Sequence, residues 1–138
     1  MPDRVLKRVD GLHGGTLIVA GIVYALLGVT WWVAPSAARL AGIAWTPWTF
    51  INDTSVGALW ACTGLLSITV GVISVGRRRL TNVAFFLDVF VPSLIALYFA
   101  FAFFLGESPR TLITTVSYLG YAALVGWVGS RPDPERIL

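Results

Sequence analysis

The stretch TSVGALWACTGLLSITVGVISVGRRR, residues 54–79, decides the fold of this chain. From Val56 to Val75 it is uncharged and mostly apolar or small. About 20 such residues are enough to cross a bilayer as an α-helix. The cations that end the stretch are typical of the cytoplasmic end of a membrane helix. They are Arg77, Arg78 and Arg79, which we interpret as topology anchors.

The composition of the whole chain is that of a membrane protein. Hydrophobic residues make up 57% and charged residues 12% of the 138 residues, whereas a typical soluble domain has about 25% charged residues. A soluble domain of this size buries only ~70% of its chain surface, which would leave much apolar surface in water. The single cysteine, Cys62, excludes an internal disulfide framework and a CxxC redox site.

The hydropathy pattern predicts one all-α domain over residues 1–138, a polytopic membrane protein with four transmembrane helices. These span about residues 14–34, 55–76, 80–105 and 109–130, and residues 35–54 form an outer interfacial loop with a short helix at 36–44. Eight of the ten Lys and Arg residues lie in the head, the 77–79 turn and the tail, on one side of this arrangement. Because cytoplasmic segments are enriched in Lys and Arg, both termini are predicted to be cytoplasmic.

Glycines recur every seven residues in each of the first two predicted helices. They are Gly14, Gly21 and Gly28 in the first and Gly57, Gly64 and Gly71 in the second. An α-helix drifts only ~20° per heptad, so each triplet stays on one face. Close van der Waals packing drives helix association in lipid, so we predict that the two helices pack through these faces. The partner stripe could equally lie in a neighbouring copy.

Two further groups of residues are predicted to fix the helices in place. Ala122 and Gly126 are four residues apart and form a small-residue packing face on the fourth helix. Tryptophan rings suit the headgroup region, where one part of the ring is apolar and the N–H is wet. The predicted interfacial aromatics at the outer side are Trp31, Trp32, Trp45 and Trp48.

Asp88 is the one ionisable side chain well inside an apolar run, and Pro92 follows it by four residues. Proline lacks the amide that would bond the Asp88 carbonyl, so carboxylate and freed carbonyl are expected together at a kink. Two interpretations stay open. Asp88 could form a proton or cation site or an interhelical contact, or it could snorkel toward the cytoplasmic interface or pair with the arginine turn.

No pattern in the sequence predicts catalysis, a metal site or a cofactor. His13 is the only histidine, and the intramembrane hydroxyls have no base beside them in the sequence. The glycines follow helical and not phosphate-loop spacing. The cations lie at the ends of apolar runs instead of forming a basic patch, so we expect no nucleic-acid partner. The expected surroundings are a lipid bilayer.

Residues 39–45 (RLAGIAW) and 117–124 (SYLGYAAL) resemble small four-helix membrane proteins of actinobacteria and actinobacteriophages. In phage genomes such proteins are often encoded near the lysis genes and called holin-like. The resemblance implies a multi-pass protein of the bacterial inner (plasma) membrane that acts by oligomerising.

Three non-enzymatic functions follow from these features. The first is a homo-oligomer with holin-like membrane permeabilisation. The second is an accessory or scaffold subunit that binds partner membrane subunits. The third is a small ion- or proton-coupled transporter that uses Asp88.

Overall fold

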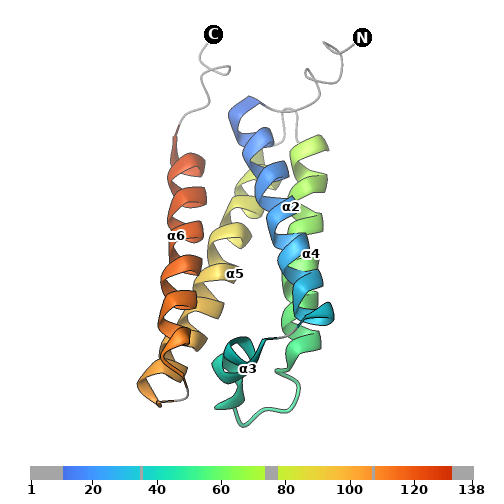
Figure 1. The fold of residues 1–138 in the computed structure, drawn as a ribbon. Helices are drawn as coiled ribbons and strands as arrows, with labels where there is room; N and C mark the ends of the chain where they lie inside the picture. Colours follow the sequence, from blue (N-terminus) through green and yellow to red (C-terminus); the bar gives the residue numbers. More distant parts are fainter. Residues whose placement is uncertain (1–10, 35, 74–77, 107, 132–138) are drawn as a thin grey trace.

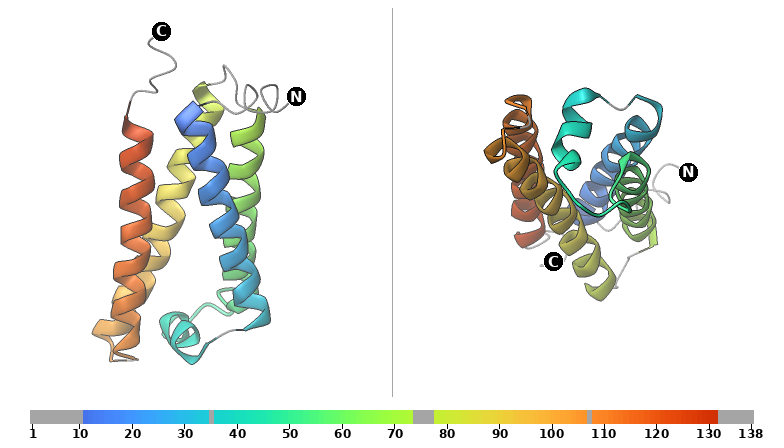
Figure 2. Two further views of the ribbon diagram at one scale, coloured as in Figure 1. Left: turned by 45° about the horizontal axis from the view of Figure 1, so that its top comes forward. Right: turned by 90° about the horizontal axis from the view of Figure 1, so that it is seen from below.

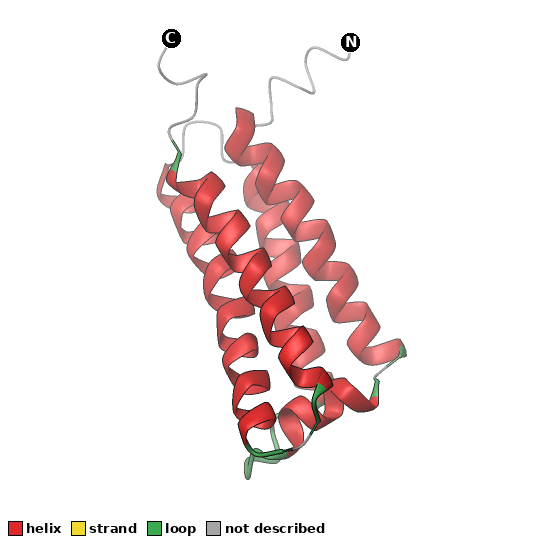
Figure 3. Cartoon of the chain, turned by 60° about the vertical axis from the view of Figure 1, so that its left-hand side comes forward, coloured by secondary structure: helices red, strands yellow, loops and turns green. Residues whose placement is uncertain are grey.

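The computed structural model describes residues 11–34, 36–73, 78–106 and 108–131. Within these residues the chain is helical and has no strand (Figure 3). The helices are α2 (Gly11–Val33), α3 (Ala37–Ala44), α4 (Asp53–Ile73), α5 (Arg78–Phe104) and α6 (Arg110–Ser130). All except α3 are long and apolar enough to cross a membrane, so the predicted all-helical fold with four such helices is confirmed. The cytoplasmic position of the termini stays a prediction.

The membrane-length helices begin up to three residues away from their predicted starts. α2 begins at Gly11, and α5 begins at Arg78, inside the arginine triplet. Long cationic side chains can snorkel to the headgroups, so a helix can extend beyond its apolar run. α4 begins at Asp53 because Asn52 caps it: Asn52 Oδ1 accepts a hydrogen bond from the Ser55 amide at 2.9 Å. Arg77 lies outside the described residues.

The long helices are arranged as two antiparallel hairpins (Figure 1). α2 packs most extensively against α4, and α5 against α6. The hairpins meet mainly through α4 and α5, whereas α2 and α6 touch much less. The short helix α3 lies at one end of the bundle, between the two hairpins when viewed from below (Figure 2).

The two glycine stripes face each other within this chain. A Cβ added to Gly21 would lie 2.6 Å from the Gly64 carbonyl oxygen, and one added to Gly64 would lie 2.5 Å from the Gly21 carbonyl oxygen. The other two glycine pairs, Gly28 with Gly57 and Gly71 with Gly14, give corresponding distances of 2.6 and 2.8 Å. Only a hydrogen atom fits such spacings, and backbones this close gain dispersion contacts that lipid cannot supply.

A second set of side chains with seven-residue spacing forms the core between the hairpins. On α2, Leu17, Tyr24 and Trp31 each follow a stripe glycine by three residues and are 0%, 1% and 0% exposed. Buried side chains at this spacing on the other helices are Trp60 and Ser67; Thr81, Asp88, Ile95 and Ala102; and Thr111, Tyr118 and Val125. Sustained seven-residue spacing keeps one face of each helix toward its neighbours along the whole bundle.

The predicted short helix after the first membrane helix is present as α3 and closes one end of the bundle. Ser36 caps it by accepting a hydrogen bond from the Arg39 amide at 3.2 Å. A Cβ on Gly42 would lie 2.5 Å from the Phe99 ring, so α3 sits directly on α5. Trp45 Nε1 donates to the Tyr98 carbonyl oxygen at 3.1 Å and ties the following loop to the same helix.

Candidate functional site

Asp88 lies on the face of α5 that points into the bundle and is 0% exposed. Ser67 of α4 donates its hydroxyl to Asp88 Oδ1. The other carboxyl oxygen, Oδ2, has no hydrogen-bond partner among the described residues. A buried carboxyl with half of its hydrogen-bonding capacity unused is rare in proteins and calls for a physical explanation.

The interpretation that Asp88 snorkels to the interface or pairs with the arginine turn is wrong for the residues that the structure describes. Arg78 and Arg79 are exposed at the end of α5. Asp88 is ten residues from Arg78, which corresponds to about 15 Å along the helix axis. The carboxyl points sideways into the bundle, so its side chain cannot bridge that distance. Its contacts are therefore interhelical.

Pro92 lies inside α5, and the helix continues through it. Proline has no amide hydrogen, so the Asp88 carbonyl loses its ordinary partner four residues later. The Tyr24 hydroxyl of α2 donates to this carbonyl oxygen at 2.7 Å. The sequence predicted the free carbonyl, and the structure shows which side chain satisfies it. Residue 88 is thus bonded to α4 through its side chain and to α2 through its backbone.

Aromatic rings continue from Tyr24 toward the end of the bundle that carries α3. Tyr24 contacts Trp60 with ring centroids 5.0 Å apart, and Trp60 contacts Tyr118 at 5.2 Å. Tyr118 then meets Phe99 at 5.9 Å, and Phe99 meets Trp31 at 6.4 Å. These rings join α2, α4, α5 and α6, and we refer to Tyr24, Trp31, Trp60, Phe99 and Tyr118 as the aromatic core.

Two indole N–H groups of the aromatic core make no hydrogen bond of ordinary geometry with the described residues. They belong to Trp31 and Trp60, which are both 0% exposed. Together with Asp88 Oδ2, they place three unsatisfied polar atoms inside the bundle. Such atoms are commonly satisfied by ordered water in folded proteins.

The four predicted interfacial tryptophans divide into different environments. The prediction for Trp31 is wrong, because it follows Gly28 by three residues and so turns into the bundle, where Arg39 covers its ring at 5.5 Å. Trp32 is 46% exposed and donates to the Thr54 carbonyl oxygen at 3.1 Å. Trp45 is partly buried against α5, and Trp48 is 54% exposed. Trp32 and Trp48 thus retain surfaces suited to an interface.

The small residues of α6 face α5. Ala122 is 4% exposed, and a Cβ on Gly126 would lie 3.3 Å from Val89 Cγ2. Farther along, a Cβ on Gly129 would lie 2.7 Å from the Phe85 ring. This small-residue face therefore packs inside the second hairpin, as the glycine stripes do in the first.

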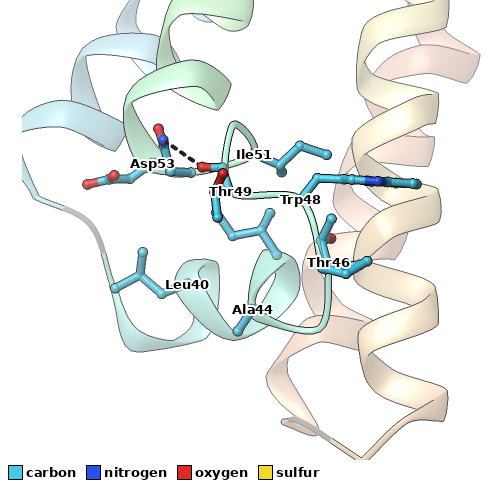
Figure 4. A pocket seen from close by; sticks show the side chains of 10 residues that line it. Leu40, Ala44, Thr46, Trp48, Thr49, Ile51 and Asp53 are labelled. Carbon is cyan, nitrogen blue, oxygen red and sulfur yellow. Dashed lines mark hydrogen bonds between the residues drawn. The ribbon is translucent and has the colours of Figure 1, made fainter.

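A pocket of about 320 Å³ lies between α3 and the loop that leads into α4 (Figure 4). Leu40 and Ala44 line it from α3, and the side chains of Thr46, Trp48 and Asp53 surround it from the loop and the start of α4. The pocket has one carboxylate and no neighbouring base or cation in its lining. Its walls offer no arrangement for acid–base or nucleophilic chemistry.

The sequence predicted a site at Asp88 and Pro92, but it did not predict the contacts of Ser67 and Tyr24 or the burial of Trp31 and Trp60. A signal for them was present in the heptad spacing. Tyr24 and Trp31 lie three residues after Gly21 and Gly28, and Ser67 lies three after Gly64. Residues at this offset lie beside the glycine face and turn toward the rest of the bundle.

No protein-family model, curated protein or solved structure matches the chain.

Proposed function

We propose that this protein is a non-enzymatic, multi-pass membrane protein that binds and releases a proton at Asp88, as a small proton-coupled carrier. One observation carries the proposal: the Asp88 carboxyl is 0% exposed between α4 and α5 and has one oxygen without a partner. An ionisable side chain inside a membrane span is costly, by ~2.5–3.5 kcal/mol on insertion scales, and is usually retained for function.

The immediate surroundings favour a proton over a metal cation. Na⁺-sized or divalent ions need several oxygen ligands, and Ca²⁺ takes six to eight. The side-chain oxygen bonded to the Asp88 carboxyl is the Ser67 hydroxyl, which uses its hydrogen as the donor. The described residues contain no group of three His, Cys, Asp or Glu side chains that could share an ion with it. A single carboxyl is sufficient for a proton.

Proton uptake at this position would be linked to the packing of the two hairpins. Asp88 belongs to α5 and bonds to Ser67 of α4 across the surface on which the hairpins meet. When it is ionised, the carboxylate needs further donors or water, and these can enter only if the helices separate locally. When it is protonated, the neutral carboxyl is compatible with the closed arrangement. The proton would therefore select between two packings of the same bundle.

The two other functions proposed from the sequence need free surfaces for assembly. A holin-like oligomer would associate through the glycine faces and the small-residue face of the fourth helix, but Gly21 and Gly64 contact each other within one chain. Assembly would have to use the outer faces instead, such as the side of α6 where a Cβ on Gly120 meets nothing within 4 Å. A scaffold subunit would bind partners through the phenylalanines of α5, and nothing in this surface selects a partner. We therefore rank proton coupling first.

The test is proton flux into liposomes that contain the purified protein and a trapped pH dye, driven by a potassium diffusion potential. We expect acidification with the natural protein and a return to the protein-free rate with Asp88→Asn. Asp53→Asn is the matched control, because it removes the other described carboxylate, which lies at the outer end of α4. Flux that is equal in Asp88→Asn and the natural protein, or absent from both, would refute the proposal.

A further inference from the structure

A groove of about 590 Å³ runs between α2 and α6, two long helices that make few contacts with each other. Its buried floor contains Ala20, Tyr24 and Val125, and its rims include Val19 and Leu124, which are 63% and 58% exposed. The lining is almost entirely apolar. Because it opens sideways along two membrane-length helices, the groove faces the hydrocarbon of the bilayer.

The groove ends where α2 and α6 are joined. At the end of the bundle that carries Gly11, His13 Nε2 donates to the Arg131 carbonyl oxygen at 2.8 Å. Leu12 and Val128 line the groove next to this bond, and Tyr24 and Tyr121 line it near the middle of the helices. From Leu12 to Tyr24 the groove is about 18 Å long. It thus extends from one membrane surface to about mid-bilayer.

The groove is too narrow to enclose a whole helix. A volume of about 590 Å³ over about 18 Å leaves a mean cross-section of about 33 Å². A helix with side chains is about 10 Å across and needs about 80 Å². A single hydrocarbon chain is far narrower, is apolar like the lining, and is the most abundant molecule at this depth of a bilayer.

Positive charge lies beside the surface end of the groove. Arg131 follows Val128 by three residues, so both lie on the same side of the α6 axis. Its guanidinium lies over the Trp127 ring at 4.0 Å. Arg78 and Arg79 begin α5 at this end of the bundle, and the described residues there include no carboxylate. An arginine guanidinium is well suited to a phosphate group.

We propose that this groove is a binding site for an anionic phospholipid, with one acyl chain between α2 and α6 and the phosphate at Arg131. The acyl chain alone gains little binding free energy in the groove, because the hydrocarbon of the bilayer solvates it equally well. Selectivity therefore comes from the headgroup, and one arginine near a membrane surface contributes about a fivefold preference. This inference does not depend on proton binding at Asp88.

The experiment is native mass spectrometry of the purified full-length protein released from micelles. The micelles contain equal amounts of phosphatidylglycerol and phosphatidylcholine with identical acyl chains. We expect one retained phosphatidylglycerol per chain. Leu124→Trp, which fills the groove from its exposed rim, should remove both lipids. Arg131→Gln should keep the tail site and reduce the preference for phosphatidylglycerol about fivefold.

Matched controls separate this site from the general lipid coat. Val83→Trp adds an equally bulky ring at a position of α5 that is 54% exposed and outside the groove lining. Arg110→Gln removes a cation at the opposite end of the bundle. Both controls should bind lipid as the natural protein does. Equal retention of the two lipids, or no change with Leu124→Trp and Arg131→Gln, would overturn the proposal. A lipid-free dimer abolished by Leu124→Trp would also overturn it and would assign the groove to a second copy.

Discussion

The Tyr24 hydroxyl donates a 2.7 Å hydrogen bond to the carbonyl oxygen of Asp88, the residue whose buried carboxyl accepts from Ser67 of α4. Pro92 creates the need for this bond, because the proline leaves the carbonyl without an amide partner. A tyrosine of the first hairpin therefore supplies the hydrogen bond that the proline removes from a helix of the second hairpin. The contact connects the packing of the hairpins to the backbone that carries the carboxyl.

Tyr24→Phe should destabilise the bundle by about 1–2 kcal/mol, because it leaves the buried Asp88 carbonyl unsatisfied. In a Pro92→Ala background the restored amide can bond the carbonyl, so the same change should cost close to nothing. A double-mutant cycle of unfolding free energies measures this coupling. Tyr121→Phe, at a tyrosine that is 42% exposed, is the control and should have little effect. Equal costs of Tyr24→Phe in both backgrounds would contradict the proposed role of Pro92.

Gly64→Ala should prevent the first hairpin from closing as it does in the natural protein. The added Cβ would lie 2.4 Å from the Ala25 amide nitrogen, which is backbone and cannot rotate away. Overpacking of this kind costs about 1–3 kcal/mol, although alanine by itself favours a helix over glycine by about 1 kcal/mol. Gly120→Ala is the matched control, because its Cβ meets nothing within 4 Å and should be neutral or stabilising. Thermal unfolding in detergent distinguishes the two, and identical behaviour would refute the close approach.

The tight contact of the two stripes could be predicted because it depends on a regular spacing within each helix. Gly21 and Gly64 belong to triplets of equal length, and glycine at seven-residue intervals has a direct steric meaning in lipid. The spacing could not say whether the facing stripe belonged to the same chain. That outcome depends on the path of the connection between α2 and α4, which local periodicity does not describe.

The core between the hairpins was harder to predict because membrane composition gives little contrast between inside and outside. In a soluble protein, a buried tryptophan is less polar than the residues beside it in the sequence that face water. In a bilayer, Trp31 and Trp32 are adjacent, both suit an interface, and differ only in the angle at which they leave the helix. Asp88 could be recognised from its charge alone, but its partner Ser67 is one of several intramembrane hydroxyls. Only the placement of α4 against α5 distinguishes it from the others.

Trp60→Leu should cost about 2 kcal/mol or more, because this ring contacts both Tyr24 and Tyr118 in the aromatic core and is 0% exposed. Trp48→Leu changes the same residue type at a position that is 54% exposed, and should leave stability within about 0.5 kcal/mol. Chemical unfolding in mixed micelles, followed by circular dichroism, provides the comparison. A larger loss for Trp48→Leu would contradict the burial of Trp60.

Labelling of single cysteines tests the predicted orientation, which rests on the eight cations in the head, the 77–79 turn and the tail. The background is Cys62→Ser, since the natural cysteine is exposed on α4. Trp48→Cys places a thiol in the loop before α4, and Ser130→Cys places one at the opposite end of the bundle, where α6 ends. In intact cells a membrane-impermeant maleimide should label the first variant, and it should label the second only after lysis. The reverse pattern would place the arginine-rich end outside and contradict the charge rule for this chain.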